Sequence, residues 1–452
     1  MNSLWKKFRR SARDFTRERR GNVAVTFALA TLPVIGMAGA AVDYSHANSI
    51  KAAMQSALDS TALMLSKDAA DLSNSDLQTK AKNYFTALFT RPEAKNIQIT
   101  AAYSTSGGSN VVVNGSAKVD TSLLGIVGYK QIGVNGTATA KWGSERLRVA
   151  LALDVTGSMS SDGKMTALKA ATKNLLTQLK GAASVNGDVY VSIIPFSKDV
   201  NVGSGNHAQN WIDWTEWNDN NGDCSKKSVY STKSSCQSAG GSWKTDNHNT
   251  WNGCITDRGD VGSPNSANYD QKVTATRANI TASRFPAENY DSCPVAMKGL
   301  TYDWTSLNNL VDSMQPNGNT NQPIGLVWAW QSLVGGGPLT APAKDSNYTY
   351  KEIIILMSDG LNTENRWSTS QSSVNKRMYD SSAGGIGTCA NAKAANVTIY
   401  SIQVDTGGDG LSTVMQNCAS SSDKFYRITS AGDLGTVFSA IGTNLSKLRV
   451  AK

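Results

Sequence analysis

Nearly continuous apolar segments alternate with helical segments along the C-terminal half of the chain, from Arg146 onward. Such apolar runs are typical of strands that are buried on both faces. When helices separate them, the pattern favours a mainly parallel sheet covered on both sides, an α/β fold. The expected strands are 146–155, 188–197, 351–360 and 396–405, and the expected helices are 164–180 and 323–334. Ligands of such sheets bind at the carboxyl ends of the strands, so a site is expected in the loops that follow them.

The alternation stops between residues 201 and 295, where Trp, Asn, Gly and Cys are abundant. A long irregular stretch inside a compact domain is usually a functional insertion. The six cysteines form no CxxC pair, and an even number in an exported chain favours disulfides over buried free thiols. We expect Cys389 to pair with Cys418 and the remaining four to pair within the insertion: Cys224, Cys236, Cys254 and Cys293.

A stretch of 21 residues without a charge, Asn22–Val42, is long enough to cross a bilayer once as a helix. Residues 1–21 hold eight Lys and Arg, whereas the rest of the chain has 36 basic and 33 acidic residues. The basic charge therefore indicates a membrane surface and not nucleic acid. The positive-inside rule places the N-terminus in the cytoplasm and all residues after Val42 outside. A signal peptide cleaved near Ala38–Ala40 is the alternative.

Helical spacing of apolar residues predicts that the membrane helix continues to about residue 67. A second helix is expected over 75–90, capped by Ser75, and strands follow from Ile97. This pattern predicts a small α+β extracytoplasmic domain over 43–146. The complete expected order is a basic cytoplasmic segment, a transmembrane helix, this α+β domain and an α/β domain with its insertion: 1–21, 22–42, 43–146, and 147–450 with 201–295 inserted.

Small oxygen-bearing side chains gather in three loops at the expected strand ends. Asp154, Thr156 and Ser158 follow the first strand, Thr320 precedes the helix 323–334, and Asp359 follows the strand 351–360. Carboxylates and hydroxyls are the ligands that hard divalent cations prefer. The pattern predicts a site for one such cation, magnesium first, with calcium or manganese as alternatives.

Two known families resemble parts of this sequence. RRGNVAVTFALATLP followed by VDYSHANSIKAAMQSALDSTAL is similar to Tad/Flp pilus assembly proteins of the TadE and TadG type. Related prepilins are cut after a glycine and carry Glu at the fifth position beyond it. Thr26 stands at that position after Gly21, so the resemblance implies a retained anchor, as in the TadG-like branch.

The three loops resemble the metal-ion-dependent adhesion site of von Willebrand factor A domains. Asp154, Thr156 and Ser158 match its first loop, Thr320 its second and Asp359 its third, with Thr156 where serine is usual. The insertion accounts for the unusually long spacing between Ser158 and Thr320. The resemblance implies a metal whose open position accepts a carboxylate from a protein partner.

These expectations combine into a non-enzymatic accessory protein of Tad/Flp pilus assembly, anchored in the inner membrane by a single span. Its partner would be a pilus or secretion component that supplies a carboxylate to the metal. The three histidines are scattered and suggest no pairing of a nucleophile with a base, which argues against a hydrolase. A surface adhesin, and an envelope scaffold with a vestigial metal site, are the alternatives.

Overall fold

The computed structural model describes residues 21–105, 108–143, 145–226, 229–259, 269–273, 275–277, 279–334 and 339–450. The chain divides into two compact units between Trp142 and Gly143. Nearly all of the basic segment expected at 1–21 lies outside the described residues.

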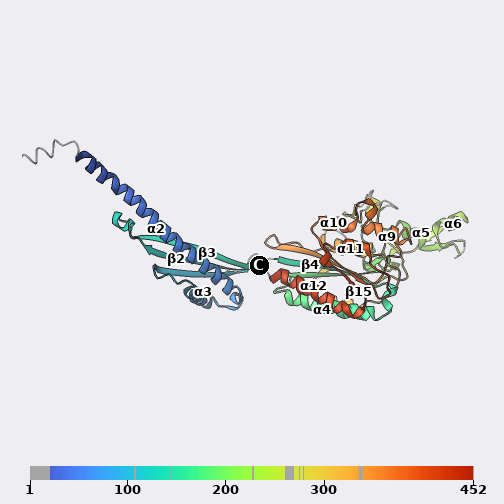
Figure 1. The fold of residues 1–452 in the computed structure, drawn as a ribbon. Coiled ribbons are helices and arrows are strands. Elements are labelled where there is room, and N and C mark those ends of the chain that lie inside the picture. The colour runs from blue at the N-terminus through green and yellow to red at the C-terminus, as the bar shows by residue number, and fades with distance from the viewer. Residues whose placement is uncertain are drawn as a thin grey trace, which may run out of the picture. The chain divides into compact units, whose positions relative to one another are not determined.

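The first unit is a three-stranded antiparallel sheet that packs against two helices (Figure 1). The strand order is β1-β2-β3. Its elements are α2 (Gly21–Leu65), α3 (Asn74–Leu88), β1 (Ala94–Ser104), β2 (Ser109–Asp120) and β3 (Gln131–Trp142). The 3₁₀ turn η2 (Leu124–Val127) lies in the loop between β2 and β3.

Helix α2 has two halves with opposite surroundings. Its first half exposes large apolar side chains such as Phe27 and Ile35, whereas Ile50, Met54 and Leu58 in its second half are fully buried. The segment Val25–Leu65 is long and apolar enough to cross a membrane. The predicted continuation of the helix beyond Val42 is confirmed, because the helix ends at Leu65. The buried stripe packs on the unit's own sheet.

The expected cap of α3 is wrong by two residues. Ser73, not Ser75, is the N-cap, and its side chain accepts a hydrogen bond of 3.2 Å from the backbone N–H of Asp76. The backbone of Ser73 is extended, with φ −65° and ψ 159°, as a cap requires, while Ser75 already lies inside the helix. Ser, Asn, Ser and Asp stand in a row at 73–76, and each of these residue types can cap a helix, so the sequence left the position ambiguous.

The second unit is built on a mainly parallel sheet in which β5, β4, β13, β14 and β15 lie side by side, each parallel to its neighbour. Strand β12 pairs antiparallel with β5. Numbered along the chain, these six strands lie in the order 3-2-1-4-5-6, that of a doubly wound sheet. The bounds are β4 (Glu145–Asp154), β5 (Val189–Phe196), β12 (Lys298–Thr301), β13 (Thr349–Ser358), β14 (Thr398–Val404) and β15 (Phe425–Ile428).

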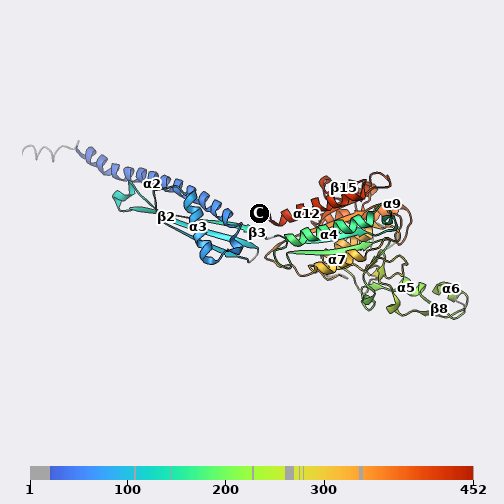
Figure 2. The same cartoon turned by 90° about the horizontal axis from the view of Figure 1, so that it is seen from below.

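Helices cover both faces of this sheet. Alternate residues of β4 point to opposite sides, and both sets are apolar and buried. Leu147, Val149 and Leu151 pack with α4, α7 and α12, which lie on one side in Figure 2, while Ala150 and Ala152 pack with α8 to α11 on the other. The α/β class expected from the sequence is therefore confirmed. The helices are α4 (Lys164–Ala182), α7 (Trp304–Ser313), α8 (Gln322–Val334), α9 (Gln371–Met378), α10 (Thr388–Ala394), α11 (Thr413–Cys418) and α12 (Leu434–Val450).

The insertion after β5 is made of short elements and stapled by disulfides. Cys224 is bonded to Cys236, Cys254 to Cys293, and Cys389 to Cys418, so the expected pairing is confirmed. Tryptophans of the insertion fill its thin core instead of facing outward, since Trp211, Trp217 and Trp251 are buried. The elements are β6 (Val200–Asn201), β7 (Ile212–Asp213), α5 (Thr215–Asn220), β8 (Gly222–Cys224), α6 (Lys233–Ser238), β9 (Trp243–Thr245), β10 (Cys254–Ile255) and β11 (Phe285–Pro286).

Candidate functional site

The predicted site lies where the winding of the sheet reverses. Strand β4 ends at Asp154 and the neighbouring parallel strand β13 ends at Ser358, directly before Asp359. After β4 the chain crosses to β5 on one side, whereas after β13 it crosses to β14 on the other. The loops that follow β4 and β13 diverge at this switch point, which is where doubly wound sheets bind their ligands.

Four of the five predicted residues are joined in one hydrogen-bonded series. The backbone N–H of Thr156 donates to Asp154 Oδ1 at 2.8 Å, and the hydroxyls of Thr156 and Ser158 lie 3.0 Å apart. Ser158 Oγ then donates to Asp359 Oδ1 at 2.7 Å. The 3₁₀ turn η3 (Gly157–Ser160) after Thr156 brings Ser158 back toward the strand end. Residues 201 positions apart therefore meet through their side chains.

Thr320 belongs to a second loop that the backbone holds against the first. The carbonyl of Gly318 accepts from Gly157 N at 2.9 Å, and Thr320 N donates to Thr363 Oγ1 at 2.8 Å. Thr320 is nearly buried, but its hydroxyl shares no hydrogen bond with the other four side chains in the described part of the chain. The structure thus brings the three loops together, and it links Thr320 to the others through the backbone only.

The site concentrates negative charge in a buried place. Asp154 is fully buried, and this burial, with repulsion from Asp359, raises the pKa of Asp154 to about 7 despite hydrogen bonds from Ser358 and Thr156. The Ser358 hydroxyl lies 2.5 Å from Asp154 Oδ2 and donates to it. Two neighbouring carboxylates out of contact with water are costly unless a cation neutralises them. The donor set, two carboxylates and hydroxyl groups, therefore fits a hard divalent cation.

One cation of the chain itself already reaches this cluster. Lys164, in the first turn of α4, places its Nζ 2.6 Å from Asp359 Oδ2, and both side chains are buried. A positive charge at a helix N-terminus opposes the helix dipole, so the carboxylate offsets an unfavourable position. The sequence carried no signal for this contact beyond a lysine that follows the first loop.

The sequence analysis also did not predict several polar residues that surround the three loops. Gln322 Nε2 donates to Ser358 Oγ at 3.0 Å and to the carbonyl of Gly360 at 2.8 Å, while Gln322 N donates to Asn362 Oδ1 at 2.7 Å. All three side chains are buried. Ser358 adjoins the predicted Asp359 and could have been found from that position, whereas nothing in the local sequence distinguished Gln322 or Asn362.

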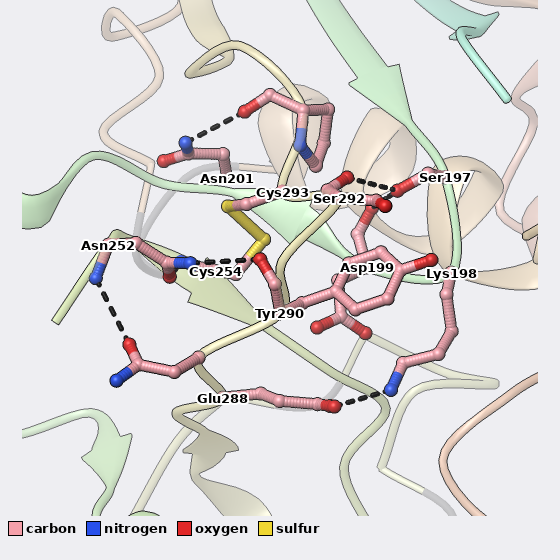
Figure 3. The surroundings of a disulfide bond; sticks show 12 residues. Ser197, Lys198, Asp199, Asn201, Asn252, Cys254, Glu288, Tyr290, Ser292 and Cys293 are labelled. Atoms are coloured by element: carbon pink, nitrogen blue, oxygen red, sulfur yellow. Dashed lines mark hydrogen bonds and ion pairs between the residues drawn. A yellow bond between two sulfur atoms is a disulfide. The ribbon is translucent and has the colours of Figure 1, made fainter. Parts of the chain in front are cut away.

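The insertion borders the second loop of the site. Tyr290 Oη accepts from Asn319 N at 3.0 Å, and Asp257 Oδ2 accepts from Asn321 Nδ2 at 2.8 Å. Figure 3 shows Tyr290 close to the Cys254–Cys293 disulfide, which joins β10 to the segment that carries the tyrosine. The insertion thus supports the loop of Thr320 from outside the sheet.

Among residues placed by the structure, no group of three or more His, Cys, Asp or Glu side chains could hold a metal ion. A cation at the three loops would therefore depend on hydroxyl ligands besides the two carboxylates.

Residues 21–66 match the family model described as "Putative Flp pilus-assembly TadE/G-like". The N-terminal segment is TadE/G-like. The matched residues cover α2 almost exactly from its first residue to its last, so the TadE/G-like segment is the apolar helix itself. No curated protein matches the chain.

Solved structures with a similar fold include proteins of bacterial pili. The pilus adhesin SpaC from Lactobacillus rhamnosus GG has a TM-score of 0.35 and 15% identity, over 80% of this chain and 35% of its own. The von Willebrand factor domain of the type V pili tip protein Mfa5 from Porphyromonas gingivalis has a TM-score of 0.37 and 12% identity, over 69% of this chain and 98% of its own.

A third structure is proximal thread matrix protein 1 from the mussel byssus with a zinc-occupied MIDAS motif. Its TM-score is 0.33 at 12% identity, over 67% of this chain and 46% of its own. This chain therefore spans about a third of the length of SpaC and less than half of the length of the byssus protein.

Proposed function

We propose that this chain is a membrane-anchored, non-enzymatic accessory protein of Tad/Flp pilus assembly that binds a protein partner through a metal at the three loops. The observation that carries the proposal is the hydrogen-bonded series from Asp154 through Thr156 and Ser158 to Asp359 at the switch point of the sheet. The TadE/G-like helix supports the membrane and pilus part of the proposal. In this proposal, the first half of α2 crosses the inner membrane. The rest of the first unit and the second unit lie outside the cytoplasm.

Asp154, Thr156, Ser158, Thr320 and Asp359 would hold the ion, with magnesium the expected metal. A bound divalent cation would supply an electrophilic position for an acidic group of the partner. The chain's own contribution is to keep the donors together: Ser358 orients Asp154, Ser158 orients Asp359, and Tyr290 holds the loop of Thr320 through Asn319. Two carboxylates against one Lys164 leave a net negative charge, which favours cation binding.

Thermal unfolding of the full chain in nanodiscs tests the metal site. Binding to the folded state alone stabilises it by about 2.7 kcal/mol when magnesium stands at 100 times its dissociation constant. We expect magnesium to raise the melting temperature of the wild type above its value in chelator. The variant Asp154→Asn should lose this increment, because it removes one of the two charges that attract the ion.

Asp312→Asn is the matched control, since Asp312 is an exposed aspartate of the same unit that pairs with Lys173. It should keep the wild-type response to magnesium. A wild-type melting temperature that is indifferent to magnesium, calcium and manganese at millimolar levels would contradict the metal site and favour the scaffold alternative. Complementation of a deletion strain with Asp154→Asn, scored by pilus formation, tests the biological role.

A further inference from the structure

The loop between β2 and β3 exposes apolar side chains beside the membrane helix. Residues 121–129 (TSLLGIVGY) carry no charge, and Leu123, Ile126 and Tyr129 are 39%, 79% and 70% exposed. Most large apolar side chains of this unit that are not in α2 are buried or half-buried. An exposed apolar group at one loop therefore calls for a partner surface.

The loop is fixed to α2 at the place where the uncharged span ends. Asp43 is the first charged residue of α2, and its carboxylate accepts hydrogen bonds from the backbone N–H groups of Ser122, Leu123 and Leu124 at 2.9, 2.9 and 2.7 Å. Asp43 is 5% exposed, so the loop covers its charge.

Gly39 gives the loop its close approach to the helix. A Cβ at Gly39 would lie 2.6 Å from Leu123 Cβ, nearer than real side chains come. Leu123 therefore rests on the helix backbone one turn before Asp43. In Figure 1 this teal loop lies beside α2, at the end of the sheet nearest the first half of the helix.

The depth of the loop follows from the length of the span. Twenty-one helical residues from Asn22 to Val42 extend about 31 Å, close to the roughly 30 Å of a bilayer's hydrocarbon core. Gly39 then lies about 4.5 Å inside the outer boundary of that core. Side chains that rest on it lie at the headgroup boundary, the level at which tyrosines are enriched in membrane proteins.

We propose that the loop 121–129 is a membrane-contacting element, whose Leu123, Ile126 and Tyr129 side chains enter the interfacial layer of the bilayer that α2 crosses. The inference rests on the membrane anchor of the proposed function. The loop then acts as a second, peripheral contact that fixes the first unit on the outer surface of the bilayer. The buried Asp43 lies at the outer boundary of the hydrocarbon core. Backbone N–H groups of the loop donate hydrogen bonds to its carboxylate there, in place of the water that becomes scarce.

Fluorescence quenching by lipid tests this contact in the full chain. All six cysteines are in disulfides, so one introduced cysteine is a unique thiol for an environment-sensitive fluorophore. The test position is Ile126→Cys, in vesicles of phosphatidylcholine and phosphatidylglycerol with doxyl-labelled phosphatidylcholine. Ile35→Cys, in the exposed apolar half of α2, reports insertion of the helix.

Thr139→Cys is the matched control, because Thr139 is exposed and lies eight residues along β3 from Gln131, about 27 Å away. We expect the label at 126 to be quenched several-fold more strongly than that at 139. A label at 126 that is quenched no more than at 139, while that at 35 is quenched, overturns the inference and leaves the anchor intact. Blue-shifted emission at 126 without quenching by lipid overturns it too, since a protein then covers the loop. An unquenched label at 35 removes the anchor and the inference together.

Discussion

Lys164 offsets part of the negative charge of the proposed metal site through its ion pair with Asp359. Its ammonium group offsets one of the two negative charges that the carboxyl groups of Asp154 and Asp359 can carry. It therefore stabilises the cluster in the absence of metal and competes with a divalent ion for Asp359. In the proposed function, Lys164 would therefore lower the cost of the site without metal and also limit its affinity for the ion.

Replacement of this lysine should separate the two effects. Removing one partner of a buried ion pair costs about 3 kcal/mol, so Lys164→Met should melt at a lower temperature than the wild type in chelator. The increment produced by magnesium should increase, because the ion no longer competes with an ammonium. Melts in chelator and over a magnesium titration measure both. Lys173→Met, which breaks a pair with the exposed Asp312, serves as control, and an unchanged magnesium response in Lys164→Met would refute the competition.

At the scale of elements, strand ends were predictable and their supporting contacts were not. The apolar runs located β4, β5, β13 and β14 within a few residues, and four predicted residues at the ends of β4 and β13 are joined by hydrogen bonds in the structure. Lys164 and Tyr290 escaped prediction, because each acts through a partner far along the chain that no local pattern reveals. The predicted N-cap of α3 was wrong for the opposite reason, because several adjacent residues could each cap the helix.

The disulfide Cys254–Cys293 should matter to the site more than Cys224–Cys236 does. The first holds the segment of Tyr290 beside the loop of Thr320, whereas the second joins β8 to α6. Each serine double variant should lose about 2–4 kcal/mol of stability or less. Only Cys254→Ser with Cys293→Ser should also weaken magnesium binding, measured by isothermal titration. Equal magnesium affinities in the two double variants would show that the insertion does not support the site.

The turn after β14 should be sensitive to acid. Asp405 accepts hydrogen bonds from Arg427 Nε at 3.0 Å and from Asp409 N at 2.7 Å, and the arginine is the main cause that lowers the pKa of Asp405. A lowered pKa in the folded state contributes stability above the ordinary value of 3.8, which is lost as the pH falls through the lowered value. Asp405→Asn should destabilise the protein at pH 7. It should also make the free energy of unfolding decrease less between pH 7 and pH 3 than it does in the wild type. Urea unfolding at pH 7 and pH 3 measures it, and an identical pH dependence in wild type and variant would contradict it.

At the scale of the whole molecule, the disulfides and the charge distribution both support the proposed location of the second unit outside the cytoplasm. Three disulfides require an oxidising environment, and the basic residues before the span favour a cytoplasmic N-terminus. We expect the mature chain to keep its N-terminal segment, which intact mass spectrometry of the purified membrane protein measures. A mature chain that begins at Ala41 would instead identify a cleaved signal peptide.

Strand β4 connects the first unit, which carries the proposed anchor, to the candidate site. It starts at Glu145, three residues after β3 ends at Trp142, and it finishes at Asp154 in the candidate site. A partner held at Asp154 and an anchor N-terminal to Glu145 would pull on opposite ends of one strand that is paired on both sides. Tension along a strand loads its hydrogen bonds together in shear instead of opening them one at a time. In the proposed function, this connectivity would suit the chain to resist mechanical force between the membrane and its partner.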